Sequence, residues 1–299
     1  MLQTFLKEAN RVVIGKEKQF KLAISCLLAG GHLLLEDEPG MGKTTFAKTL
    51  AKLLGLDFSR IQFTSDLLPA DIIGVSVYDR ESQKFVFHPG PIFSQIVMGD
   101  ELNRASPKTQ SAFLQAMEEQ AVNVDGKSMA LSSPFFFIAT QNPRRSIGTF
   151  PLPESQLDRF LMKLELGYPS REAETSILMN GNPAAALADL NALLSTEEII
   201  ARQGEVKQIH CAEKIVHYII DIATESRKLN HGLSPRASLG LMHAAKAYAW
   251  LDERDFIAPE DVQAVALAVM SHRLVSGEEI RPQIGQERAR EILETVPVP

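Results

Sequence analysis

Short apolar runs alternate with helical patterns along the first half of the chain. Apolar runs with the length of buried strands occupy residues 32–36, 60–63, 95–99, 135–140 and 161–165. Helical periodicity, with apolar residues three or four positions apart, covers residues 16–28, 45–54 and 107–119. Strands that alternate with helices predict an α/β fold, in which a parallel sheet has helices on both faces and a ligand site at the C-terminal ends of its strands.

The pattern changes near residues 167–170, after which the strand signals stop. Helical patterns follow at residues 171–179, 196–203, 211–228, 235–251 and 259–273, and the alanine-rich stretch 181–194 reads as a connector. We therefore expect two domains. Residues 1–168 would hold the sheet, an N-terminal helix and two β-hairpins, and residues 169–299 would form an all-helical domain.

The two expected hairpins interrupt the first domain. Residues 75–78 and 84–87 flank a polar tip, and residues 122–124 and 129–131 flank the turn dipeptide Asp125-Gly126. Ordinary surface hairpins and functional loops are both compatible with these sequences.

Composition narrows the class of protein. The chain has 299 residues, 45% of them hydrophobic and 23% charged, as in ordinary globular proteins. A net charge of −6 gives no electrostatic case for binding nucleic acid or an anionic membrane. The N-terminal residues do not form a signal peptide, no apolar run approaches the ~18 residues of a membrane span, and two cysteines are too few for a disulfide framework. We expect a cytoplasmic protein.

A candidate phosphate-binding loop lies between a predicted strand and a predicted helix, where residues 37–44 read DEPGMGKT. Its backbone N–H groups and the positive end of the following helix would hold an anion. Lys43 would reach the β- and γ-phosphates, and the Thr44 hydroxyl would ligate Mg²⁺. The pattern's first glycine is Asp37 in this chain, and a plain glycine turn is the alternative interpretation.

Polar residues also end two later apolar runs. Asp100 and Glu101 follow the run at 95–99, where Asp100 could hold Mg²⁺ and Glu101 could polarise the water that attacks the γ-phosphate. Asn142 follows the run at 135–140, and its neutral amide could bond the attacking water or the γ-phosphate. The alternative for Asn142 is a turn before Pro143.

Three arginines are candidates for contacts with phosphate. Arg236 follows a predicted N-cap, Ser234, in the first helical turn, where a cation opposes the helix dipole and so suggests a bound anion. Arg159 could reach a neighbouring subunit's nucleotide as an arginine finger. Arg104, close after the acid pair, is the rival for that role. For each of them, an ion pair within the chain is the alternative.

The chain resembles the MoxR family of AAA+ ATPases in motifs that follow the family's order over nearly its whole length. They are LLEDEPGMGKT at 34–44, QFTSDLLP at 62–69, GPIF at 90–93, DELNRA at 100–105, ATQNP at 139–143, LPESQLDRF at 152–160, GYP at 167–169 and SPRA at 234–237. An acid at the position of Asp37 is frequent in relatives. The resemblance implies an AAA+ P-loop NTPase core followed by a helical lid domain.

The resemblance also implies a role for each matching residue. The expected nucleotide contacts are Glu38, Pro39, Gly40, Met41, Gly42, Lys43, Thr44 and Thr45 in the Walker A loop, and Val13, Ile14 and Gly15 beside the adenine. The expected metal ligands are Thr44 and Asp100. The expected catalytic residues are Glu101 in Walker B, Asn142 as sensor 1, Arg159 as the arginine finger and Arg236 as sensor 2.

Family membership would make the protein an ATP- and Mg²⁺-dependent ATPase that works as a ring, usually a homo-hexamer. Such proteins act as chaperones that mature client complexes or insert their cofactors, often with a partner that carries a von Willebrand factor A domain. Both hairpins would face the central pore of the ring. The sequence identifies neither the client nor the partner.

Two other functions remain open. A nucleic-acid motor would need basic pore tips, for which Arg80, Lys84 and Lys127 are the candidates, but the acidic balance of the chain disfavours it. A nucleotide-gated scaffold with little turnover is disfavoured because Lys43 and Glu101 are both present.

Overall fold

The fold is taken from a computed structural model that describes residues 1–124, 126–142, 149–180, 183–229, 232–275 and 283–299. At its centre lies a five-stranded sheet in which all neighbouring strands are parallel. The spatial order is β2 (Phe58–Gln62), β5 (Ile96–Asp100), β8 (Phe136–Gln141), β1 (Leu33–Glu36) and β9 (Met162–Leu164). The predicted parallel sheet is confirmed, and the order places β5, β8 and β1 side by side.

Alternation along the strands divides the core into two faces. Leu33 and Leu35 of β1 belong to one buried cluster and Leu34 to the other, because successive strand residues point to opposite faces. Three helices cover the first face: α1 (Leu2–Asn10), α2 (Glu17–Leu28) and α3 (Lys43–Leu54). The opposite face packs against α5 (Pro107–Glu119) and α4 (Pro69–Ile73). Helices on both faces of the sheet are therefore confirmed.

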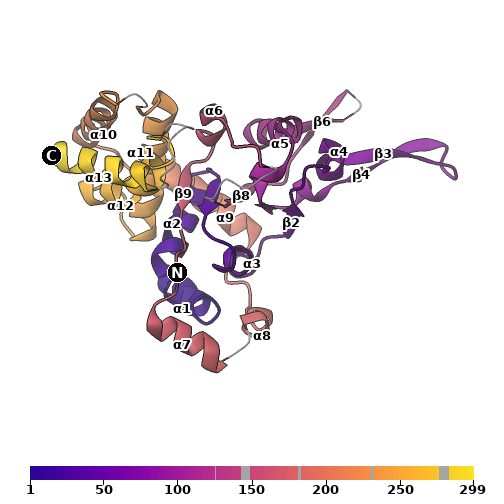
Figure 1. Ribbon diagram of the computed structural model, residues 1–299, viewed down its shortest axis with the longest axis horizontal. Coiled ribbons are helices and arrows are strands. Elements are labelled where there is room, and N and C mark those ends of the chain that lie inside the picture. The colour runs from indigo at the N-terminus through magenta and orange to yellow at the C-terminus, as the bar shows by residue number, and fades with distance from the viewer. Residues whose placement is uncertain (125, 143–148, 181–182, 230–231, 276–282) are drawn as a thin grey trace.

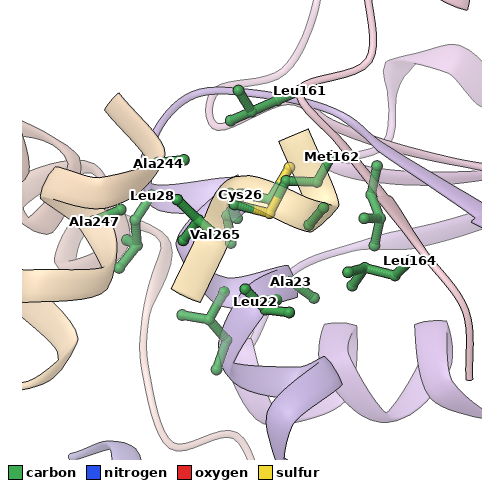
Figure 2. Packing of buried hydrophobic residues seen from close by; sticks show 14 of the residues in the cluster. Leu22, Ala23, Cys26, Leu28, Leu161, Met162, Leu164, Ala244, Ala247 and Val265 are labelled. Carbon is green, nitrogen blue, oxygen red and sulfur yellow. The ribbon is translucent and has the colours of Figure 1, made fainter. Parts of the chain in front are cut away.

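The first face continues into the helical second half of the chain, whose C-terminal helices, from residue 213 on, lie together to one side of the sheet (Figure 1). Its main helices are α9 (Thr196–Gln208), α10 (Glu213–Ser226), α11 (Pro235–Leu251), α12 (Pro259–Met270) and α13 (Ile284–Thr295). Figure 2 shows Cys26 of α2, Met162 of β9, Ala244 of α11 and Val265 of α12 in the same buried cluster. The predicted run of helices after the sheet is confirmed, and it shares a continuous core with the sheet.

In the second half of the chain, two described helices were not among the predicted ones. Residues Pro183–Ala188 form α8 inside the predicted connector, because an alanine-rich stretch favours helix even without an apolar stripe. Helix α13 was not predicted, since its buried side is limited to Gly285, Ala289 and Ile292. The remaining short elements are α6 (Glu154–Leu157), α7 (Arg171–Asn180) and the 3₁₀ turns Pro91–Phe93 and Leu102–Arg104. Residues 181–182 of the predicted connector lie outside the described residues.

Both predicted hairpins are present. Strands β3 (Gly74–Asp79) and β4 (Lys84–Pro89) form an antiparallel ribbon separate from the central sheet, which projects from the body (Figure 1). The shorter ribbon pairs β6 (Ala121–Val124) with β7 (Lys127–Ala130), and its turn residue Asp125 lies outside the described residues. Among the described helices, none is long and apolar enough to cross a membrane.

Candidate active site

The phosphate loop joins β1 to α3 through glycines in the left-handed region. Gly40 has φ of 87° and Gly42 has φ of 81°, and a side chain there would be strained although the space around both is open. Helix α3 begins at Lys43, two residues before the predicted start. Within the described residues no side chain caps this helix end. Its N–H groups and dipole therefore face the loop, as an anion site requires.

A cavity of about 350 Å³ opens at this helix end. One wall is the loop, and the other is formed by the C-terminal ends of β5 and β8. The residues that line the whole cavity are Pro39, Gly40, Met41, Gly42, Lys43, Thr44, Thr45, Asp100, Glu101, Thr140, Gln141 and Asn142. The structure thus brings the loop together with the acid pair and with Asn142, as expected from strands that end at one edge of a parallel sheet.

Thr140 connects the two acids. Its hydroxyl donates to Asp100 Oδ1 at 2.6 Å and accepts from the backbone N–H of Glu101 at 3.0 Å. Arg60 of β2 donates to the other oxygen of Asp100 at 2.5 Å. Sequence reasoning did not select Thr140 or Arg60. The sequence signal for Arg60 was its place next to the apolar Ile61 on a predicted strand, since neighbouring strand residues point to opposite faces.

The carboxylate of Glu101 is held by two neighbours. It accepts from Arg104 at 2.9 Å and from Gln62 Nε2 at 3.3 Å. Arg104 is therefore paired within its own chain. Glu101 has φ of 56°, in the left-handed region that residues other than glycine seldom adopt.

The ammonium of Lys43 lies over the loop, where it donates to the backbone oxygens of Asp37 at 2.5 Å and Glu38 at 3.1 Å. Partial burial lowers the pKa of Lys43, an effect that the carboxylates of Asp37 and Asp100 oppose. A phosphate oxygen could take the place of these neutral carbonyls and add a charge-assisted hydrogen bond.

Asp37 has a structural reason to replace the first glycine of the pattern. Its buried carboxylate accepts from the N–H groups of Leu166 at 2.5 Å and Gly167 at 3.0 Å. Its backbone is outside the left-handed region, so glycine is not needed there. Lys16 holds the same stretch from the other side, donating to the carbonyls of Leu166 at 2.5 Å and Tyr168 at 3.0 Å. The loop is thereby bound to the chain segment that leaves the sheet.

Changing Asp37 to glycine should destabilise the fold even though it restores the usual loop pattern. The change leaves the N–H groups of Leu166 and Gly167 without their acceptor, at a cost of roughly 1–3 kcal/mol for a buried donor. Urea unfolding would measure the loss. Asp57→Gly, at a chain position exposed to solvent, controls for the added backbone freedom of glycine. A stability of Asp37→Gly equal to wild type would contradict this role.

The predicted adenine contacts lie outside the cavity wall. Val13 packs against the core, and the N–H of Gly15 donates to Asn10 Oδ1 at 2.7 Å. Ile14 is half-buried between them. Lys16 connects this stretch to residues 166–168, which Asp37 also holds. The adenine role of residues 13–15 stays a prediction.

Arg159 and Arg236 lie together, away from the phosphate loop of their own chain. Both pair with Glu118 at the end of α5, Arg159 at 3.1 Å from its carboxylate, and both line a second cavity of about 130 Å³. The hydrogen bond from Arg236 lowers the pKa of Glu118, so that carboxyl stays ionised. Ser234 caps α11 as predicted, by accepting from the N–H of Ala237. The structure therefore groups these two arginines with each other and separates them from Lys43 and Glu101.

Comparison with known proteins agrees with this geometry. The family described as ATPase family associated with various cellular activities (AAA) matches residues 32–162, and the AAA lid domain matches residues 223–296. The uncharacterized protein YeaC of Bacillus subtilis is 46% identical over 100% of this chain and 95% of its own length. Chaperone MoxR1 of Mycobacterium tuberculosis is 37% identical over 100% of this chain and 82% of its own. The crystal structure of a candidate ATPase from Cytophaga hutchinsonii superposes with a TM-score of 0.88 at 33% identity, covering 99% of this chain and 94% of that one.

Proposed function

Because the chain belongs to the MoxR family of AAA+ ATPases, we propose that it hydrolyses ATP as a magnesium-dependent ring that remodels or matures client protein complexes, or inserts their cofactors. One observation carries the proposal: a single cavity joins the phosphate loop to Asp100, Glu101 and Asn142. A relative named as a chaperone supports the client-directed part.

Within the cavity each residue would have a separate task. Lys43 and the N–H groups of the loop would hold the β- and γ-phosphates, and Asn142 would bond the γ-phosphate or the attacking water. Glu101 would accept the proton of that water. Thr44 and Asp100 line one cavity and carry oxygen ligands of the kind that Mg²⁺ prefers, so they would hold the metal. Bound there, Mg²⁺ would neutralise charge on the phosphates.

Among the described residues that line the cavity, Lys43 is the one cation. Arg159 and Arg236 are paired with Glu118 and do not line the cavity. We therefore place both arginines at the neighbouring subunit's nucleotide, where Arg159 would be the arginine finger. This goes beyond the expectation for Arg236 as sensor 2. A sensor 2 that acts within its own chain would lie beside the phosphate loop of that chain. Turnover would then need the ring, with a homo-hexamer as the expected form.

The projecting ribbon favours a protein client over a nucleic acid. Val77, Tyr78 and Phe85 are exposed along it. The basic residues of its tip, Arg80 and Lys84, are matched by the acids Asp79 and Glu81, so the tip offers no net positive charge to a phosphate backbone. A partner with a von Willebrand factor A domain would complete the assembly.

Turnover per subunit should rise with protein concentration, because subunits must associate before Arg159 meets a nucleotide. Phosphate release with Mg²⁺-ATP across a dilution series, together with sedimentation velocity of the same samples, would test this. A specific activity that is constant while the ring dissociates to monomers would contradict the proposal. Stimulation by single-stranded DNA would favour the nucleic-acid motor, and the absence of turnover in intact rings would favour the scaffold.

A further inference from the structure

The chain segment that carries Arg159 is held by a buried arginine from the helical half. Arg273 follows α12, and only 6% of its side chain is exposed. Its Nε donates to Asp158 Oδ1 at 2.7 Å, and Nη2 donates to the carbonyls of Asp158 at 3.1 Å and Phe160 at 2.7 Å. Nη1 donates to the carbonyl of Leu161 at 3.1 Å. One side chain therefore binds the residues on both sides of Arg159.

Two further contacts join the same segment to the helical half. His272 Nε2 lies 3.0 Å from the carbonyl of Phe160, and because a carbonyl can only accept, this nitrogen carries the proton. The hydroxyl of Ser234, the N-cap of α11, donates to Asp158 Oδ2 at 3.1 Å. One carboxylate oxygen of Asp158 thus accepts from Arg273, and the other accepts from Ser234, the residue just before the helix that carries Arg236.

Close packing completes the attachment. Leu161 lies against Gly240 of α11, where a Cβ would come within 2.9 Å of Leu161 Cδ1. The main chain on either side of Arg159 is consequently fixed to α11 and α12, while its own side chain rests on Glu118 and the carbonyl of Leu114.

We propose that Arg273 is a positioning residue for ATP hydrolysis, which fixes the main chain around Arg159 so that the arginine finger moves with the helices α11 and α12. Arg273 does not line the phosphate-loop cavity, so it would act only through Arg159. The inference rests on the proposed role of Arg159 at the neighbouring subunit's nucleotide. Movement of the helical half in one subunit would then set the distance from Arg159 to the phosphate next door.

The fork of a guanidinium is needed for this task. The nitrogens of Arg273 lie in one plane and donate in different directions. They reach the carboxylate of Asp158 and three backbone carbonyls of residues 158–161. A lysine at this position keeps the charge but has all its donors on a single atom, so it cannot bond these oxygens together. Arg273→Lys should therefore free the segment without removing the positive charge.

Arg273→Lys rings should show a kcat lowered about 10- to 100-fold with the KM for ATP within about threefold of wild type, since a misplacement of about 1 Å can cost ~10²-fold in rate.

The matched control is Arg254→Lys. Arg254 makes two bonds of 2.5 Å to the buried Asp261 at the other end of α12, away from residues 158–161. This control should lower the thermal unfolding temperature and leave kcat unchanged. Asp158→Asn should lower kcat in the same direction as Arg273→Lys.

Mixed rings separate positioning from a general folding defect. A Glu101→Gln subunit has an intact Arg159, so mixing it with Arg273→Lys subunits should restore turnover at the phosphate loops of the latter, to the extent seen with Arg159→Ala subunits. Turnover of Arg273→Lys rings near wild type, or a defect that mixing does not restore while that of Arg159→Ala is restored, would overturn the inference. Normal turnover by Arg159→Ala would refute the proposed arginine finger itself, and our inference with it.

Discussion

Changing Glu101 to glutamine should lower ATP turnover by roughly 10²- to 10⁴-fold, the contribution typical of a positioned general base. Glu101 is the acid that follows Asp100 at the end of β5, and it lines the cavity opposite the phosphate loop. Glutamine keeps the length of the side chain and can still bond Arg104, but its amide cannot take a proton from water. Single-turnover phosphate release would measure the change.

ATP binding should survive this substitution. The loop and Lys43, which would contact the phosphates, do not depend on the carboxylate of Glu101, and the loss of a negative charge in the cavity reduces repulsion. Isothermal titration with ATP should therefore give an affinity equal to wild type or tighter. Glu119→Gln, an exposed acid at the end of α5 outside both cavities, is the control and should turn over normally. If Glu101→Gln hydrolyses ATP within about threefold of wild type, another group must act as the base.

The same variant offers a route to the client. A ring that binds ATP without hydrolysing it would stay in its ATP-bound state, so affinity capture should retain the client and the partner that the sequence does not identify.

Arg159→Ala should bind ATP normally and lose roughly 10³-fold or more in kcat, as expected of an arginine finger. In the isolated chain Arg159 touches Glu118 and the carbonyl of Leu114, neither of which lines the phosphate-loop cavity. The loss should thus appear at the neighbouring subunit's site. Mixing with Glu101→Gln subunits would detect this, since those subunits supply the missing arginine.

Two comparison variants make the result for Arg159 specific. Arg11→Ala removes an exposed arginine whose ion pair is with Glu8, and it should have no effect on turnover. Arg104→Ala tests the rival, which is paired with Glu101 of its own chain. A large loss for Arg104→Ala that mixing restores, with Arg159→Ala near wild type, would transfer the trans-acting role to Arg104.

The parts of the site that stand beside predicted strands were predictable. Lys43 and Thr44 stand where the loop after β1 enters α3, and Asp100, Glu101 and Asn142 stand at the ends of neighbouring parallel strands, where the topology forces them to one edge of the sheet. Local pattern also identified Ser234 as an N-cap, because the side-chain acceptor and the N–H it binds are three residues apart.

Contacts between distant segments were not predictable. The hydrogen bond from the N–H of Leu166 to the carboxylate of Asp37 joins residues 129 positions apart, and the pair of Arg236 with Glu118 joins residues 118 positions apart. The first depends on the pairing of β1 with β9, and the second on how the helical half packs against α5; no local periodicity encodes either. For the same reason the position of Arg236, away from its own phosphate loop, became visible only in the folded chain.

The projecting ribbon has a consequence for how the family can diversify. Strands β3 and β4 pair with each other and not with the central sheet, and their base is fixed by Gly74 and Gly90, where a Cβ would come within 2.2 Å of a backbone oxygen. Substitutions at the ribbon's outer end, such as at Tyr78 and Phe85, do not touch the packing that holds the nucleotide site, so their effects on stability should be independent of it. Residues of the ribbon could therefore change in evolution while the residues of the nucleotide site stay the same.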